Sequence, residues 1–480
     1  MKSALAWAAV VCLALLLGVF GSSMGLAAQG ETAGPTPSPT PRAFSPEIQL
    51  TWESLRGPSE RVTYAVAAGL AGKTLYAGTW GHGVYRSSDR GSSWTRVGPD
   101  RRRLVKALAV LPSSDRTVYA GTYSEGLLRS TDGGLTWTQL GNSTPFRELD
   151  ATHLDRSPFY VESLLILAER GGNSVVLAGT RNGIWASGAF SETWTHLTAG
   201  FADSDRAYSI QALSRSPNGW LFAGTMDGLY SSQDDGRTWR LTGPPDGYPD
   251  ASHSIFSLAV ITDAIHSSGT LLIGTGGAGV YSLSLAESNP GSQPWITNTL
   301  PLTDTRARTI QALLAAPDGT AYAGTVDAGV FETHDGGLTW EQRTEGLPAH
   351  ARSILSLSRD PLDGAVYAGT YGDGVYRLPR AGERWEPAKG QPGKELPVDF
   401  TVQKVAFAGH EAERLLAGLE VGGLYSTSHQ IEPDSPWARL SRSAHRPCPR
   451  PARSGGRGRG PFHRDRGDGR RCLPQRRCWR

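Results

Sequence analysis

Cysteine is scarce in this chain of 480 residues: there are four, and none lies between residues 47 and 441. Cys12 stands in an apolar run near the N-terminus, and Cys448, Cys472 and Cys478 stand in the C-terminal tail. The long middle segment must therefore be stabilised by packing rather than by disulfide bonds, as a segment of that size can be. It also has no Cys–His spacing typical of a metal site. We expect no metal and no cofactor.

Several other patterns are absent from the middle segment. No stretch sustains a helical period of apolar residues, so helices are not expected to form its core. It contains no P-loop, no Rossmann fingerprint and no set of nucleophile and base with recognisable spacing. These absences argue against the common nucleotide-dependent enzymes and the common covalent hydrolases.

The middle segment is instead built from a repeat. Residues Ser87–Trp94 follow the pattern Ser/Thr-x-Asp-x-Gly-x-Ser/Thr-Trp, which returns at Ser130–Trp137, Ser232–Trp239 and Thr333–Trp340. A second marker, Ala-Gly-Thr or Ile-Gly-Thr, comes about fifteen residues before the tryptophan that ends each of these boxes. It ends at Thr79, Thr122, Thr180, Thr225, Thr275, Thr325 and Thr370, and a degenerate copy stands at Ala417-Gly418-Leu419. Self-similarity at a fixed period of this length indicates a repeat architecture.

Eight units follow from the two markers. Four keep the whole box, and four keep only its final tryptophan, at Trp194, Trp295, Trp385 and Trp437. Each unit has four short runs rich in β-branched and aromatic residues, separated by Pro, Gly and Asp; in the sixth unit they are 309–314, 321–324, 329–332 and 339–342. Four antiparallel strands per unit make one blade of a β-propeller. We expect an all-β protein with a single propeller of eight blades; seven blades with a displaced unit is the alternative.

The segment Ile48–Glu53 resembles a spare fourth strand. By pairing with the last blade it would close the ring and leave no exposed strand edge.

The box residues have the chemistry of a turn. Asp89 can accept hydrogen bonds from its own turn, Gly91 can adopt a positive φ, and Trp94 is expected to begin the fourth strand with an apolar face to bury. A catalytic carboxylate would have no reason to recur in four blades, so the box is interpreted as structural. Its residues are Asp89, Gly91, Trp94, Asp132, Gly134, Trp137, Asp234, Gly236, Trp239, Asp335, Gly337 and Trp340.

This pattern resembles the Asp-box, or BNR, repeat of sialidases and of sortilin-like, Ycf48-like and xyloglucanase-type propellers. The resemblance covers residues of about 75 to 440. It implies that the box lies on the hairpin between the third and fourth strands, away from the active face. It does not transmit an activity, because these families share a fold and differ in function.

The two ends of the chain differ from the propeller, residues 47–441. Residues 1–28 resemble an export signal, with Lys2, an apolar run over residues 4–20 and small residues for cleavage at Leu26-Ala27-Ala28. An uncleaved membrane anchor through residues 4–20 is the alternative. Residues 29–46 form a Pro/Thr-rich linker. We expect the protein outside the cytoplasm, secreted or anchored at the cell surface.

Residues 442–480 form an arginine-rich tail. It carries 13 Arg and no Lys against two Asp, a net charge of +11, so the rest of the chain is 3 − 11 = −8. We interpret this tail as disordered and as a possible frameshift product, and we expect no nucleic-acid partner.

Candidate ligand residues lie in two sets of loops. The loops between the second and third strands of each unit surround the mouth of a propeller's channel. Their variable members are Trp80, His82, Tyr123, Glu125, Asp227, Asp327, Tyr371 and Asp373. Aromatic side chains beside carboxylates would suit a carbohydrate.

The second set stands two residues before the first apolar residue of each innermost strand. Its members are Arg103, Tyr208, His253, Arg308 and Arg352. Three guanidinium groups and an imidazole around one mouth would bind a carboxylate, sulfate or phosphate, because each Arg can donate to two oxygens. Loop arginines that simply face solvent are the alternative.

Two classes of function remain open. The first is a non-catalytic scaffold whose loop face binds a polysaccharide, a peptide or a partner protein. The second is a sialidase-like or other glycoside hydrolase, which would need two carboxylates about 5–10 Å apart around a sugar. The sialidase Phe/Tyr-Arg-Ile-Pro motif has one echo, Tyr376–Pro379, but its position in the repeat is that of an ordinary third strand. No catalytic residue is therefore assigned, and the scaffold is preferred.

Overall fold

The computed structural model divides the chain into two units, residues 1–47 and 48–480, and all residues it describes lie in the second. The described ranges are 49–54, 63–69, 74–89, 93–98, 104–123, 126–140, 160–168, 174–191, 193–244, 253–262, 269–286, 295–298, 300, 307–361, 363–380, 382–388, 390–391, 394–395, 401–408, 414–420 and 423–430. The expected export signal, linker and arginine-rich tail fall outside these ranges. Within them, no helix is long and apolar enough to cross a membrane.

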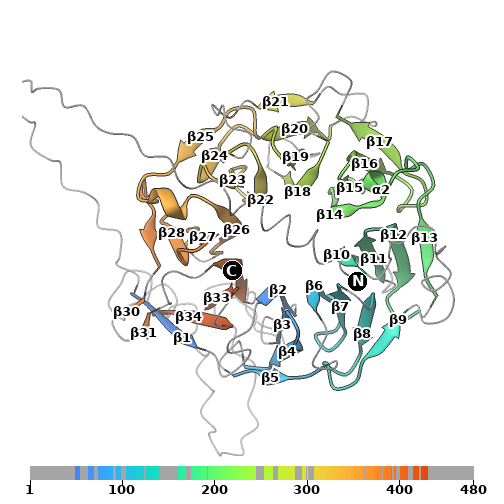
Figure 1. Ribbon diagram of the computed structural model, residues 1–480, viewed down its shortest axis with the longest axis horizontal. Helices are drawn as coiled ribbons and strands as arrows, with labels where there is room; N and C mark the ends of the chain where they lie inside the picture. Colours follow the sequence, from blue (N-terminus) through green and yellow to red (C-terminus); the bar gives the residue numbers. More distant parts are fainter. Residues whose placement is uncertain are drawn as a thin grey trace, which may run out of the picture. The chain divides into compact units, whose positions relative to one another are not determined.

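The described residues form eight four-stranded antiparallel sheets, one for each unit of the repeat, and a two-stranded hairpin. Figure 1 shows the sheets around a common centre, in chain order. The eight-bladed propeller is confirmed, and the seven-bladed alternative is wrong. The innermost strands are β2 (Thr63–Ala68), β6 (Val105–Val110), β10 (Val161–Ala168), β14 (Ile210–Arg215), β18 (Ile255–Ile261), β22 (Ile310–Ala315), β26 (Ile354–Arg359) and β32 (Val402–Ala408).

Each innermost strand pairs with a second strand, which pairs with a third. The second strands are β3 (Leu75–Thr79), β7 (Val118–Thr122), β11 (Ser174–Thr180), β15 (Leu221–Thr225), β19 (Thr270–Thr275), β23 (Ala321–Thr325), β27 (Val366–Thr370) and β33 (Arg414–Leu419). The third strands are β4 (Gly83–Ser87), β8 (Leu127–Ser130), β12 (Gly183–Gly188), β16 (Gly228–Ser232), β20 (Val280–Ser284), β24 (Val330–Thr333), β28 (Val375–Leu378) and β34 (Leu424–Gln430).

The outermost strands are the shortest in most sheets. They are β5 (Thr95–Arg96), β9 (Thr138–Leu140), β13 (Thr195–Leu197), β17 (Arg240–Gly243), β21 (Ile296–Asn298), β25 (Glu341–Arg343), β29 (Glu386–Pro387) and, in the last sheet, β1 (Gln49–Ser54). We number the blades 1 to 8 by their innermost strands, from β2 to β32. The hairpin consists of β30 (Gly390–Gln391) and β31 (Lys394–Glu395), and the short helices are α2 (Asp205–Tyr208) and η3 (Ala349–Ala351).

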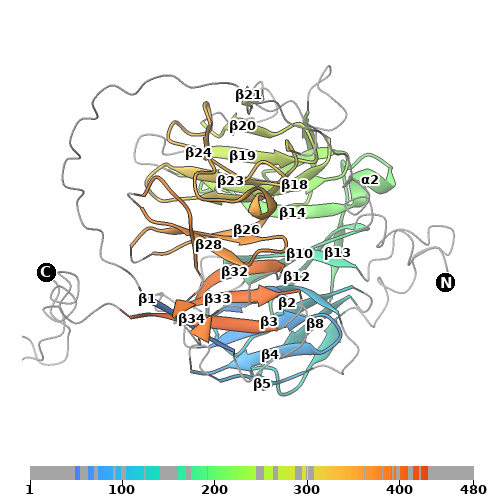
Figure 2. The same cartoon turned by 60° about the vertical axis from the view of Figure 1, so that its left-hand side comes forward.

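Strand β1 closes the ring from the other end of the chain. It pairs antiparallel with β34 over six residues, from Gln49 opposite Gln430 to Ser54 opposite Tyr425, and Figures 1 and 2 both show the two strands side by side. Blade 8 thus takes its outermost strand from the N-terminal side of blade 1, as expected from Ile48–Glu53. The pairing covers the edge that β34 would otherwise expose.

Neighbouring blades meet at the glycine of the Ala-Gly-Thr marker. A Cβ added to Gly324 would lie 2.6 Å from Cγ2 of Ile354, the first residue of the next blade's innermost strand. Real Cβ atoms do not approach other atoms so closely, so only glycine fits there. The same contact recurs from blade to blade and joins the pairs Gly78–Val105, Gly121–Val161, Gly179–Ile210, Gly224–Ile255, Gly274–Ile310, Gly324–Ile354, Gly369–Val402 and, across the closure, Gly418–Thr63.

The threonine of the marker fixes the turn that follows it. Thr325 is fully buried, and its hydroxyl donates a 2.9 Å hydrogen bond to the carbonyl of Gly329 at the start of the third strand. Six other blades repeat this bond. Blade 8 has Leu419 in this position and keeps only the backbone bond from Leu419 N–H to Gly423. The marker is therefore a structural element, like the box.

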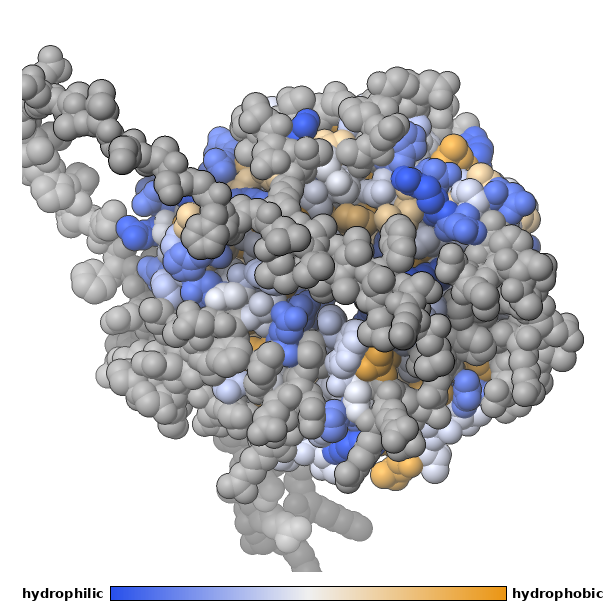
Figure 3. Space-filling view, viewed as in Figure 1, coloured by the Kyte–Doolittle hydropathy of each residue, from blue (hydrophilic) through white to orange (hydrophobic). Residues whose placement is uncertain are grey.

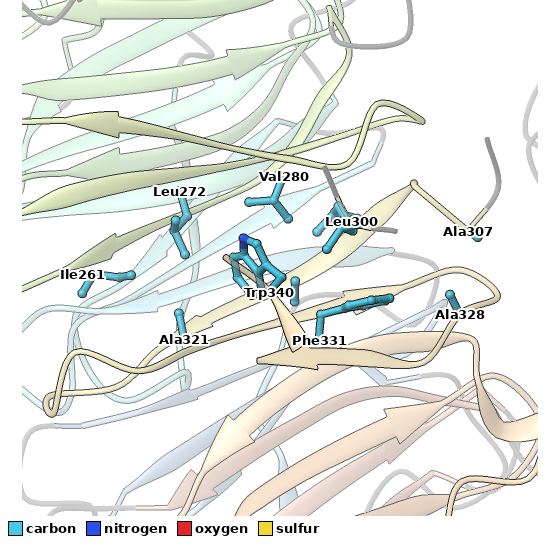
Figure 4. Packing of buried hydrophobic residues seen from close by; sticks show 11 residues of the cluster. Ile261, Leu272, Val280, Leu300, Ala307, Ala321, Ala328, Phe331 and Trp340 are labelled. Atoms are coloured by element: carbon cyan, nitrogen blue, oxygen red, sulfur yellow. The ribbon is translucent and has the colours of Figure 1, made fainter. Parts of the chain in front are cut away.

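The core lies between blades. Figure 4 shows Trp340 of blade 6 packed among Leu272 and Val280 of blade 5 and Phe331 of its own blade. All four side chains are buried. Each blade thus buries one face of its sheet against its neighbour, as a sheet with an apolar face requires.

The box holds the turn at the opposite end of the blade from the marker. In blade 2, Thr136 donates its backbone N–H (3.0 Å) and its hydroxyl (2.6 Å) to the Asp132 carboxylate. Ser130 also donates its hydroxyl to Asp132 (2.8 Å) and accepts a hydrogen bond from Gly134 N–H (2.7 Å). Gly134 has a φ of 95°, which favours glycine.

The box recurs with the same bonds in the other three complete copies. Asp89, Asp234 and Asp335 each accept a backbone and a hydroxyl hydrogen bond from the residue four positions later. Gly91 lies outside the described residues.

The box tryptophan differs slightly from expectation. Trp94 precedes the fourth strand, which begins at Thr95, so it ends the turn rather than starting the strand. In blade 2 the Trp137 indole N–H donates hydrogen bonds of 2.9 Å to two carbonyls, that of Val97 in the preceding blade and that of Gly134 in its own turn. This tryptophan therefore connects its turn to the preceding blade.

Gly324→Ala should lower the free energy of unfolding by about 1–3 kcal/mol, because the added methyl group overlaps Ile354 in a packed interface. Gly188→Ala is the matched control, since a Cβ there would meet nothing closer than 3.6 Å. Denaturant unfolding of both variants measures the difference. Equal unfolding midpoints for the two variants would show that the interface between blades accommodates the added methyl group without loss of stability. The glycine contact would then not set the spacing of the blades.

Protonation of the aspartate carboxylates in the four boxes should lower the stability of the fold. Burial raises the pKa of Asp132, but hydrogen bonds from Thr136 and Ser130 outweigh it and hold the pKa well below its ordinary value. The pKa values of Asp89, Asp234 and Asp335 are lowered in the same way. The stability that these four carboxylates contribute is fully present above the unfolded-state pKa of about 3.9. It is lost as the pH falls through the lower pKa values of the folded state.

Asp132→Ala should therefore lower stability by about 1 kcal/mol at neutral pH, as loss of a capping side chain does, and by less in acid. Asp327→Ala removes an exposed carboxylate for comparison. The midpoint of denaturant unfolding, followed from pH 7 into acid, measures both. A constant difference between the Asp132 variant and the native chain at every pH would contradict the assignment.

Candidate functional site

The two sets of candidate loops lie at the same end of the blades, which we call the loop rim. In blades 2, 3 and 5 to 8, the residue after the second strand donates its backbone N–H to the carbonyl of the residue before the innermost strand of the same blade. Tyr123 donates to Leu104 at 3.0 Å, and Tyr371 donates to Ser353 at 2.9 Å. The boxes are at the other end, because successive strands are antiparallel. The residues that the repeat leaves variable are therefore gathered on one rim.

Every innermost strand has a β-bulge at its second residue. In blade 2, Val105 pairs with Thr122 and Ala107 with Gly121, so Lys106 is the extra residue. A bulge re-aims a side chain and bends the strand. The bulged residues are Tyr64, Lys106, Glu162, Gln211, Phe256, Gln311, Leu355 and Gln403. They are chemically diverse, whereas the residue before each of them is a conserved packing residue of the repeat.

In blades 1, 3 and 5, the bulged side chain lies beside the second-to-third-strand loop of its own blade. The ring centroids of Tyr64 and Trp80 are 5.5 Å apart in blade 1. In blade 3, Arg181 Nε lies 3.2 Å from Glu162 Oε1. In blade 5, a Cβ on Gly276 would lie 3.2 Å from the Phe256 ring. Bulge and loop residues are thus neighbours in these three blades.

In blades 1 to 3, bulge and loop residues form a continuous cluster. Trp80 lies 6.1 Å from Tyr123 of the next blade, and Tyr123 meets Tyr160 edge-on at 4.3 Å. The Arg181 guanidinium carbon lies 4.7 Å from the centre of the Tyr160 ring, which is cation–π geometry. Trp80 is 44% exposed. We call this set the blade 1–3 cluster; its members are Tyr64, Trp80, Lys106, Tyr123, Tyr160, Glu162 and Arg181.

Glu162 organises the charges of the cluster. Its side chain is only 5% exposed, and it forms ion pairs with Lys106 of blade 2 and Arg181 of its own blade. Burial opposes ionisation, but the two cations and their hydrogen bonds outweigh it and lower the pKa of the Glu162 carboxyl. Glu162 is thus a buried anion that holds two cations in place.

Asp373 lies in a separate hydrogen-bonded group on blade 7. It accepts a hydrogen bond from the Tyr376 hydroxyl and lies 3.2 Å from Nε2 of His350, a residue of η3. Burial and the neighbouring carboxylate raise the pKa of Tyr376. Asp373 is only 12% exposed, so its carboxylate is committed to these two partners.

Asp227 is tied to α2 on blade 4. Ser204, which caps this helix, donates its hydroxyl to Asp227 at 3.4 Å, and Arg206 Nε lies 3.9 Å from the carboxylate. Tyr208, at the end of α2, stacks on Phe201 at 6.3 Å. Both predicted residues therefore shape the rim locally.

The other residues predicted before the innermost strands are Arg103, His253, Arg308 and Arg352, each from a different blade. Arg308 and Arg352 accept backbone hydrogen bonds from Gly279 and Gly329 of the preceding blades, both at 2.8 Å. Their Nε atoms are buried and have no hydrogen-bond partner among the described residues. His253 is half-buried before β18. The ring of basic side chains stays a prediction, because Arg103 lies outside the described residues.

The remaining loop members are His82, Glu125, Asp327 and Tyr371. His82 is half-buried, and its carbonyl accepts a hydrogen bond from Arg96 Nε at 3.0 Å. Asp327 is exposed, and Tyr371 is 44% exposed. Glu125 lies outside the described residues. Of the predicted ligand residues, Trp80 and Tyr123 are the two that the structure brings into one cluster.

Sequence reasoning missed Tyr64, Lys106, Tyr160, Glu162 and Arg181. A signal for them exists: aligned by repeat, they stand either beside the first apolar residue of an innermost strand or first in a second-to-third-strand loop. We find no metal site to add, because within the described ranges no three His, Cys, Asp or Glu side chains group together in a way that could hold an ion.

Comparison with known proteins supports the fold. Residues 46–265, which include blades 1 to 4 and the first strand of blade 5, match the family model described as the DUF6242 β-propeller domain. Among curated proteins, no sequence matches the chain significantly. The β-propeller fold expected from the resemblance is confirmed.

Several solved propellers are similar. Sqt1 from Chaetomium thermophilum, bound to the N-terminus of the ribosomal protein L10, is 12% identical with a TM-score of 0.56, and the match covers 78% of this chain and 100% of that one. Sqt1 from Saccharomyces cerevisiae is also 12% identical, with a TM-score of 0.55 and coverage of 81% and 100%. YCF48 bound to a D1 peptide is 13% identical, with a TM-score of 0.48 and coverage of 81% and 96%. At these identities the likeness concerns the fold alone.

The Glu162–Arg181 ion pair should show energetic coupling. We expect a double-mutant cycle with Glu162→Gln and Arg181→Gln to give about 0.5–1 kcal/mol, because the carboxylate is buried although the guanidinium is 40% exposed. The matched control is Glu345–Arg384, 3.8 Å apart and more than two-thirds exposed on both sides, for which we expect no measurable coupling. Additive effects at Glu162 and Arg181 would mean that Glu162 does not position the guanidinium.

Proposed function

We propose that the chain is a non-catalytic scaffold that binds a segment of another polypeptide through the blade 1–3 cluster. The observation that carries this proposal is the grouping of Trp80, Tyr123, Tyr160 and Arg181 on one rim. Tryptophan, tyrosine and arginine are the residues that contribute most to binding energy in protein interfaces.

The orientation of the rings favours a polypeptide over a sugar. Adjacent rings are tilted by 46°, 36° and 80° along the cluster, so they do not form one flat platform for pyranose rings. They present a mixture of faces and edges, into which proline, aliphatic or aromatic side chains can pack. The Sqt1 propeller, which shares this fold, was solved with the N-terminus of a ribosomal protein bound. The export signal expected in residues 1–28 supports a partner outside the cytoplasm.

Polysaccharide binding and glycoside hydrolysis are the competing functions. A hydrolase needs one protonated and one ionised carboxyl flanking the sugar. In the structure, Glu162 is paired with two cations, and Asp373 is hydrogen-bonded to Tyr376. These contacts favour structural roles for both carboxylates and support the non-catalytic scaffold.

Trp80→Ala should weaken binding of a peptide ligand by about tenfold or more, because it removes an exposed indole at the end of the cluster. Peptides are selected for binding to the native protein from a displayed library of random short sequences. The affinities of the recovered peptides for the native protein and for the variants are then measured by fluorescence anisotropy. Tyr371→Ala is the matched control: Tyr371 has the same loop position in blade 7 and the same exposed fraction of 44%.

The proposal fails if no peptide is recovered, or if the recovered peptides bind the Trp80 and Tyr371 variants equally well. A glycan array and a hydrolysis screen are run in parallel. Binding of a glycan through Trp80, or turnover of a sialoside or β-glucan, would establish the competing function instead.

A further inference from the structure

The blade 1–3 cluster presents positive charge to the solvent although it contains a carboxylate. Lys106 and Arg181 have side chains that are 45% and 40% exposed, whereas Glu162 is 5% exposed beneath them. A ligand approaching the rim therefore meets two cations and little of the anion. This contrasts with the net charge of −8 outside the arginine-rich tail.

The two cations are fixed in orientation. Glu162 engages the Nε edge of Arg181 at 3.2 Å, and the Tyr160 ring supports the guanidinium from one side at 4.7 Å. The terminal nitrogens of the guanidinium are then what a ligand can reach, and they can donate to both oxygens of a carboxylate. Glu162 also binds Lys106, so it joins cations from two neighbouring blades. A guanidinium held in this way loses less side-chain entropy when it binds.

We propose that the polypeptide segment bound by this cluster is acidic, with carboxylates received by Lys106 and Arg181 beside apolar residues that pack on Trp80 and Tyr123. Glu162 is the positioning residue. This inference rests on the proposed function and specifies the partner: an Asp- or Glu-containing segment with interspersed aromatic, aliphatic or proline residues. Electrostatic attraction between such a segment and the rim also predicts that salt weakens binding.

The experiment uses the same displayed library of random short peptides. We expect peptides recovered on the native chain to contain more Asp and Glu than the unselected library, and their affinity to fall as salt increases. Lys106→Gln combined with Arg181→Gln should weaken their binding by about tenfold or more. That double variant leaves Glu162 buried without a cation. The triple variant with Glu162→Gln avoids this cost and should bind as weakly.

The outcomes separate the two proposals. Peptides that need Trp80, show no excess of acidic residues and bind the triple variant as well as the native chain would overturn the acidic partner and leave peptide binding intact. Absence of any Trp80-dependent peptide would overturn both. Glu162→Gln alone tests positioning: it should weaken acidic peptides several-fold while their aromatic residues still contribute, and unchanged affinity would remove Glu162 from the site.

Discussion

The contact between a marker glycine and the next blade's first packing residue is the constraint on which the propeller depends. At Gly324 the neighbouring Ile354 side chain occupies the space where a Cβ would stand. A blade that moved closer to its neighbour would overlap this side chain, and a blade that moved away would lose the packing. The contact therefore sets the spacing of the sheets. Eight repetitions bring Gly418 of blade 8 against Thr63 of blade 1, and β1 completes the sheet there.

The same contact explains why the rim can vary. The first residue of each innermost strand packs against the marker glycine of the preceding blade, so it must be apolar or small. The β-bulge beside it re-aims the next side chain, which is therefore free to vary. Lys106 and Glu162 occupy this released position in adjacent blades without disturbing the packing residues Val105 and Val161. Fold and ligand recognition thus depend on consecutive residues of one strand. In Figure 3, the described part of the face in view shows hydrophilic and hydrophobic residues interspersed.

Sequence alone could predict the blade count, the closing segment Ile48–Glu53 and the turn chemistry of Asp132, because each depends on local pattern or on the period of the repeat. It could not predict the bulge at Glu162. A run such as Val161–Ala168 has the composition of an ordinary strand, and the extra residue is visible only in its pairing with Thr180 and Gly179. The contacts of Trp80 with Tyr123 and of Lys106 with Glu162 cross blade boundaries. They depend on the angle between sheets, which no short pattern encodes.

The ring is nearly symmetric in its backbone but not in its rim. At the first loop position, blades 1 to 3 carry Trp80, Tyr123 and Arg181 and blades 7 and 8 carry Tyr371 and Glu420, whereas blades 4 to 6 carry Met226, Gly276 and Val326. The hydrogen bonds of the marker and the glycine contacts are the same on both sides. Structural need therefore does not account for the difference, since either kind of residue is compatible with the turn. Aromatic and charged side chains thus occupy this position in five consecutive blades of the closed ring, from blade 7 through blade 8 to blade 3. This distribution fits the proposed ligand, which covers part of the rim rather than filling its centre.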